Sequence, residues 1–111
     1  MIEVRFRVFK TGDFKFSCKG HAGAGERGHD LVCAAASALA YGLIENLEQS
    51  EEMLLEGHYT EDDGVLKAEF KPKAEFVPSL MLLFRAKFNE FKALERGHED
   101  YIKVFGNGDA R

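Results

Sequence analysis

The sequence lacks a long uninterrupted run of apolar residues at its N-terminus, which reads MIEVRFRVF and alternates apolar with charged side chains. This alternation excludes the apolar core of a secretory signal peptide, and we expect no later stretch to reach membrane-spanning length. The chain also lacks repeats, linkers and low-complexity segments. We therefore expect a cytoplasmic protein in which residues 1–111 form a single domain around one hydrophobic core.

Cysteine and positive charge are also scarce. The chain has two cysteines, Cys18 and Cys33, and the cytoplasm keeps thiols reduced, so we expect one structural and one candidate reactive thiol rather than a disulfide. Fifteen Lys and Arg against nineteen Asp and Glu leave a net charge of −4. This balance argues against a duplex-binding module, which must neutralise many phosphates, and a cationic peptide is an easier partner.

Apolar side chains are abundant, at 45% of the residues with ten phenylalanines, and their spacing predicts the secondary structure. Alternation of apolar with polar residues predicts five strands, over residues 2–8, 14–18, 53–60, 65–70 and 101–105. Two turns support this assignment: Thr11-Gly12-Asp13 joins the first two strands, and Asp62-Asp63-Gly64 favours a tight hairpin between the third and fourth.

Helical spacing predicts a first helix from Asp30 to about Gln49 and a second from Pro78 to about Gly97. Residues 22–29, AGAGERGH, contain three glycines and no apolar residue larger than Ala, so we expect a mobile loop there, and a lid over a bound peptide is one hypothesis for it. The order ββαββαβ predicts an α+β two-layer sandwich, with both helices packed on one face of a mostly antiparallel sheet.

His21 and Cys33 are the candidate catalytic residues. If Asp30 caps the first helix, Cys33 occupies its third position, where unpaired amides and the helix dipole stabilise a thiolate. His21 ends the second strand and could accept the thiol proton, while the amides of Cys33 and Ala34 could bind an oxyanion. The alternative is structural: Cys33 is a small packed residue beside alanines, and His21 a polar strand end.

Two other kinds of site compete with this interpretation. Cys18, His21, His29 and Cys33 are all metal-ligand types, but residues three apart on a strand point to opposite faces, so Cys18 and His21 should diverge and we expect no metal or other cofactor. The second alternative is a non-catalytic ribosome-associated or RNA-binding module. Its motivation is a set of outward-facing cations on the first two strands, although a solvated sheet face explains them equally well: Arg5, Arg7, Lys15 and Lys19.

The region around both candidate residues resembles a known signature. The segments that carry it are Gly20-His21-Ala22, Gly28-His29-Asp30-Leu31-Val32-Cys33-Ala34-Ala35 and Ser37-Ala38-Leu39. They are similar to the signature of the bacterial ribosomal-processing cysteine protease family. The resemblance implies a homodimer that removes a short hydrophobic N-terminal extension from large-subunit ribosomal protein L-twenty-seven. The charge and the lack of an apolar N-terminal run lead us to expect neither nucleic acid nor a membrane as the primary partner.

The resemblance also implies a role for each site residue. His21 would be the general base, Cys33 the nucleophile, and Gly20, Asp30 and Ser37 would support catalysis or substrate binding. Helical spacing places Ser37 one turn after Cys33 on the same face, where it could line a substrate groove or simply be a surface serine. Asp30 could orient His21 or only cap the helix, and capping is the default because its residue type and position already explain it.

Overall fold

The structure, a computed structural model, describes residues 1–20 and 27–106, and the side chains of residues 27–30 are outside that description. Within the described residues the chain forms five strands, two α-helices and two short 3-10 helices. In chain order they are β1 (Ile2–Val8), β2 (Phe14–Lys19), α1 (Arg27–Gln49), a 3-10 turn (Glu51–Met53), β3 (Leu54–Asp62), β4 (Val65–Pro72), a 3-10 turn (Ala74–Phe76), α2 (Val77–Glu95) and β5 (Ile102–Gly106).

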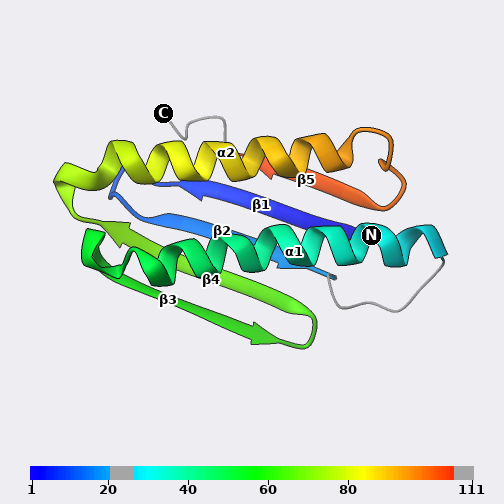
Figure 1. The fold of residues 1–111 in the computed structure, drawn as a ribbon, viewed down its shortest axis with the longest axis horizontal. Helices are drawn as coiled ribbons and strands as arrows, with labels where there is room; N and C mark the ends of the chain where they lie inside the picture. The colour runs from blue at the N-terminus through cyan, green and yellow to red at the C-terminus, as the bar shows by residue number, and fades with distance from the viewer. Residues whose placement is uncertain (21–26, 107–111) are drawn as a thin grey trace.

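The strands form one mixed sheet in the order β3-β4-β2-β1-β5. All neighbouring pairs are antiparallel except β1 and β5, which are parallel. Both helices lie on the same face of this sheet, side by side and roughly along the strands (Figure 1). The predicted α+β sandwich, with its ββαββαβ order and mostly antiparallel sheet, is therefore confirmed.

Local sequence explains the hairpin between β3 and β4. Asp62 pairs with Val65, which leaves Asp63 and Gly64 as a two-residue turn with φ angles of 52° and 76°. Positive φ at both central residues defines the type I′ turn, whose twist matches that of the flanking strands. The predicted Asp-Gly turn is thus present.

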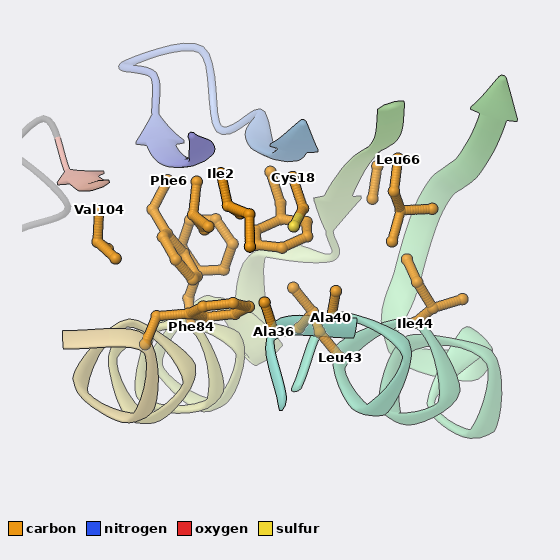
Figure 2. Close-up of a cluster of buried hydrophobic side chains, with 14 of the residues drawn as sticks. Ile2, Phe6, Cys18, Ala36, Ala40, Leu43, Ile44, Leu66, Phe84 and Val104 are labelled. Atoms are coloured by element: carbon orange, nitrogen blue, oxygen red, sulfur yellow. The ribbon is translucent and has the colours of Figure 1, made fainter. Parts of the chain in front are cut away.

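The core lies between the sheet and the helices, and its centre is aromatic. Phe6 of β1 is surrounded by four rings whose centroids lie 4.9 to 5.7 Å from its own, those of Phe16, Phe84, Phe88 and Phe91. From α1 come three fully buried residues, Ala36, Ala40 and Leu43. Figure 2 shows these side chains meeting Ile2, Phe6 and Cys18 from the strands. Small residues on α1 let this helix approach the bulky phenylalanines closely.

The start of α1 corrects two predictions. The helix begins at Arg27, so Arg27, Gly28 and His29 are helical rather than part of a loop, and Asp30 lies inside the helix instead of capping it. Packing against the sheet fixes the later turns of α1. Each residue then added at the N-terminal end of the helix gains one backbone hydrogen bond, which favours a longer helix despite the low helix propensity of Gly28. The remainder of the predicted mobile loop lies outside the described residues, so the lid stays a prediction.

A third prediction concerns membrane-spanning length. The stretch Leu31–Gln49 of α1 is 19 residues long and apolar enough, by length and composition, to cross a membrane, so the prediction that no such stretch exists was wrong. The buried side of this helix packs against the sheet, as in a core helix. Many of the apolar residues of this stretch are the ones that α1 contributes to the hydrophobic core.

Candidate active site

Cys33 lies in α1 with its sulfur turned toward the end of β2. Its side chain is buried, with 5% of its surface exposed. The Sγ–H group donates a hydrogen bond to the carbonyl oxygen of Gly20, 3.6 Å away. Cys33 is thus part of the buried core, and its sulfur lies beside Gly20, the residue that follows β2.

Gly20 is fixed from several directions. Its N–H donates to the carbonyl of Gly64 in the β3–β4 turn at 2.9 Å. Its φ angle is 85°, and a Cβ atom there would lie 3.2 Å from the carbonyl oxygen of Met1. Both the left-handed backbone and the close approach favour glycine. The carbonyl that contacts the Cys33 sulfur is thus held at a defined position.

His21 is bonded directly to Gly20, but it lies outside the described residues, and so do the side chains of His29 and Asp30. The structure therefore brings Cys33 to the residue that precedes His21 and does not place the imidazole. Among the residues that are described, no group of three or more His, Cys, Asp and Glu side chains could hold a metal ion. That search omits both histidines of the suggested metal cluster, so the absence of a metal site stays a prediction.

Helix α1 extends past Cys33 toward the N-terminus, and this changes the predicted electrostatics. Counting from Arg27, Cys33 is the seventh residue of the helix rather than the third. Only the first four amides of a helix lack an internal acceptor, and the field of the helix end falls off within the first turn. The amides of Cys33 and Ala34 are therefore not free to bind an oxyanion, and the helix end supports a thiolate there less than predicted.

Cys18 has a different environment. It is fully buried on the helix-facing side of β2, and Figure 2 shows its sulfur pointing into the core. Burial raises the pKa of the Cys18 thiol to about 12, and the neighbouring Cys33 contributes to this rise. Both cysteines are free thiols. Cys18 is the structural thiol that the sequence predicts.

Ser37 and Tyr41 follow Cys33 along one face of α1, each one helical turn further on. Ser37 is half-buried and Tyr41 is exposed. The Tyr41 hydroxyl hydrogen-bonds to the carboxylate of Glu61 in β3. The Cys33–Ser37–Tyr41 row therefore leads from the end of β2 toward the edge strand β3.

Beyond that row lies a hollow that sequence reasoning missed. It has a volume of about 320 Å³ and lies between the C-terminal half of α1 and strands β3 and β4; we call it the α1–β3 hollow. Its apolar lining includes Ile44, Leu47, Tyr59 and Phe70, and its carboxylates are Glu48, Glu51 and Glu69. Two small residues contribute to this space, Gly57 opposite Phe70 and Ala68 opposite Tyr59. Gly57 in a strand was the available signal, since a strand glycine marks a close approach or a gap.

A thiol beside the strand end that leads into a histidine provides the two residue types that nucleophilic catalysis by cysteine uses. The family model for cysteine protease Prp matches residues 1–103 of the chain. The chain belongs to this family and is a cysteine protease. The ribosomal processing cysteine protease Prp of Bacillus subtilis (strain 168) is 31% identical over 106 residues, which cover 91% of this chain and 92% of that protein.

Solved structures share the fold. The ribosomal processing protease Prp from S. aureus, in complex with a substrate peptide, superposes with a TM-score of 0.73 at 22% identity, covering 96% of this chain and all of that one. SMU.848 from Streptococcus mutans gives a TM-score of 0.73 at 27% identity, covering 96% of this chain and 93% of that one. These similarities extend over the whole sandwich, not only the segment around Cys33.

Proposed function

We propose that this protease removes a short hydrophobic N-terminal extension from large-subunit ribosomal protein L-twenty-seven, with Cys33 as nucleophile and His21 as general base. The observation that carries the proposal is the contact between the Cys33 sulfur and the Gly20 carbonyl. It brings the thiol to the residue that is bonded to His21. The relatives named as ribosomal processing proteases support the substrate class.

The proposed chemistry has two steps. The imidazole of His21 accepts the thiol proton, the sulfur attacks the scissile carbonyl carbon, and the peptide nitrogen leaves with that proton, which gives a thioester on Cys33. Water, deprotonated by the same imidazole, then hydrolyses the thioester and restores the thiol. The Gly20 carbonyl accepts the Sγ–H of the resting thiol. Because a thiolate has no proton to donate, this hydrogen bond is lost at the moment of attack.

Asp30 and Ser37 take supporting roles in the proposal. As an interior residue of α1, Asp30 no longer has capping as its default explanation, which favours a role in orienting His21. Ser37, in the Cys33–Ser37–Tyr41 row, lines the path of the substrate. Its hydroxyl is suited to bond the peptide backbone near the scissile bond.

The α1–β3 hollow provides a place for the hydrophobic extension. Ile44 is eleven residues after Cys33, about 16 Å along the helix, which an extended peptide spans in about five residues. An apolar side chain at that distance from the scissile bond would enter the apolar lining. Glu48 and Glu51 would attract a basic substrate, in keeping with the net charge of −4.

The proposed assembly follows the family resemblance. We propose a cytoplasmic homodimer, and β3 and β5 are the edge strands of the sheet available to pair with a second copy. Light scattering coupled to size exclusion should then give twice the chain mass of 12.5 kDa. A mass equal to that of one chain at micromolar concentration would contradict the dimer without affecting the proposed chemistry.

The test is incubation with the N-terminally extended ribosomal protein, followed by measurement of the intact mass of the product. Cys33→Ala is expected to lower the cleavage rate by at least about 10⁴-fold, because removing a catalytic nucleophile eliminates the covalent pathway. Cys18→Ala is the matched control, since it removes the other thiol and should retain cleavage. Equal rates for Cys33→Ala and the unaltered chain would overturn the assignment of the nucleophile, and an unchanged substrate mass with the unaltered chain would overturn the substrate.

A further inference from the structure

The face of the sheet turned away from the helices is basic. Both α-helices lie on the opposite side, and no helix of the described residues covers this one (Figures 1 and 2). Strand alternation directs six exposed cations onto it from four strands: Arg5, Arg7, Lys15, Lys19, Lys67 and Lys103. The whole chain carries a net charge of −4, so positive charge is concentrated on this open sheet face.

The carboxylates that share the open sheet face are fewer than its cations: Glu3, Glu56, Asp62 and Glu69. Arg5 pairs with Glu3 and Lys15 with Glu69, each at 3.4 Å and with partly exposed side chains. Across the described part of the chain, Lys19, Lys67 and Lys103 have no ion pair. Exposed ion pairs such as the two present contribute little and exchange readily for another anion. The face therefore retains an excess of positive charge.

A shallow depression marks the centre of the face. Arg5, Ser17 and Lys67 lie in one row across β1, β2 and β4. Because serine is shorter than its two neighbours, a hollow of about 230 Å³ opens here, lined also by Arg7, Lys15 and the Glu69 carboxylate that pairs with Lys15. A guanidinium, an ammonium and a hydroxyl around one depression suit a phosphate group, which accepts hydrogen bonds from all three.

Aromatic rings lie at two ends of the same face. Phe105 of β5 has 42% of its surface exposed, and the Arg5 guanidinium lies 4.2 Å from its ring centroid. Phe9, just after β1, is approached by Arg7 at 5.5 Å and by Lys15 at 5.2 Å. Arg5 and Arg7 on β1 are two residues apart, about 7 Å, and Lys15 and Lys19 on β2 are four residues apart, about 13 Å. Rings on which unpaired bases can stack, beside cations that follow a backbone, are the combination found in single-strand binding surfaces.

We propose that the open sheet face binds single-stranded nucleic acid. Phosphates would contact the row formed by Arg5, Ser17 and Lys67, and a base would stack on Phe105. Exposed rings favour single strands over a duplex, because only unpaired bases can stack on them. They also favour nucleic acid over an acidic peptide, because an acidic peptide would bind through the cations alone and would not use the rings. The Cys33 sulfur points to the opposite side of the sheet, so the protease could hold RNA and a peptide together. This inference does not depend on the proposed substrate or nucleophile.

The test measures fluorescence anisotropy of a labelled single-stranded RNA of about 16 nucleotides, in salt from about 50 to 200 mM. The double variant Arg5→Gln/Lys67→Gln is expected to bind at least about tenfold more weakly and to reduce the log–log salt slope by about 1.4, since each phosphate contact on a single strand contributes about 0.7. Arg85→Gln/Arg96→Gln, the same charge change on exposed residues of α2 and its C-cap, should change affinity less than about twofold.

A ring variant and two competitors complete the test. Phe105→Leu should weaken binding about tenfold without changing the salt slope, since stacking involves no counterion release. Single-stranded DNA of the same sequence is the first competitor. It offers the same phosphate and stacking contacts as the RNA but lacks the 2′-hydroxyl, so weaker competition by DNA would indicate contacts to that hydroxyl. Equal losses in the two double variants, or displacement of the RNA by polyaspartate of equal charge as effectively as by unlabelled RNA, would overturn the proposal. Circular dichroism of each variant verifies that it is folded.

Discussion

Cys18 and Cys33 both point into the space between sheet and helices, yet the fold gives them different environments. Cys18 lies on the helix-facing side of β2 with none of its surface exposed, and burial raises the pKa of its thiol to about 12. Cys33 belongs to the same core, is 5% exposed, and its thiol hydrogen-bonds to the Gly20 carbonyl. The two thiols therefore differ in position more than in burial, since the Cys33 sulfur contacts Gly20, the residue that precedes His21.

The largest effect expected from this comparison is on stability at high pH. A cysteine in the unfolded chain ionises near its ordinary pKa of 9.0, whereas burial raises the pKa of folded Cys18 to about 12. Between these values the unfolded state binds fewer protons, so the free energy of unfolding should fall by about 1.4 kcal/mol per pH unit, up to about 4 kcal/mol. Urea unfolding of the unaltered chain and of Cys18→Ala from pH 8 to 11 measures the difference in slope. Parallel curves would contradict the buried thiol.

The next effect is on alkylation. At pH 8 a thiol of pKa about 12 is ionised to only about one part in ten thousand, and a fully buried sulfur also needs local opening before it can react. Iodoacetamide should therefore label Cys33 at least about a hundredfold faster than Cys18 in the folded protein. Peptide mass spectrometry assigns the label, and labelling in urea provides the reference in which both react. Equal native rates would remove the distinction between the two thiols.

A smaller effect is expected at Gly20, which holds the carbonyl against the Cys33 sulfur. Gly20→Ala should destabilise the fold by about 2 kcal/mol, because alanine tolerates a positive φ poorly and its Cβ would press on the Met1 carbonyl. Gly97→Ala is the matched control: its φ is 87° and nothing lies near its Cβ position, so about 1 kcal/mol is expected. Thermal unfolding gives the two values, and identical losses would show that the close approach to Met1 contributes nothing.

The smallest effect is expected at Ser37, one turn from the nucleophile. Ser37→Ala should raise KM about threefold with little change in kcat, as for the loss of one neutral hydrogen bond to the substrate backbone. Ser79→Ala, at an exposed serine of α2, should leave both constants unchanged. Steady-state kinetics on a peptide spanning the scissile bond separates the two parameters. An effect on kcat alone would place the Ser37 hydroxyl in the chemical step instead.

Much of the fold could be predicted because the signals are local. Alternation in Ile2–Val8 and Phe14–Lys19 identified both strands and their buried faces, and Asp63-Gly64 identified the hairpin. The start of α1 could not be predicted, because Asp30 has the chemistry of a cap and Gly28 that of a loop. Packing further along the helix outweighs both preferences.

The site was predictable only in part. Spacing placed Ser37 on the face of Cys33, and alternation placed Cys18 in the core. The contact between the Cys33 sulfur and the Gly20 carbonyl joins residues 13 apart across two elements, and the α1–β3 hollow depends on how β3 registers with β4 and on how closely α1 approaches it. Both features depend on contacts between different elements, which the spacing of apolar residues within one helix or strand does not predict.

The parallel pairing of β1 with β5 has a consequence for synthesis. Ile2 pairs with Ile102, so the first strand leaves the ribosome about 100 residues before the neighbour that will cover its edge. Synthesis adds about 5 to 20 residues per second, so the backbone edge of β1 at Ile2 and Val4 stays unpaired for about 5 to 20 s. A nascent chain of this protein is therefore prone to associate with other chains through the β1 edge until β5 emerges and pairs with it.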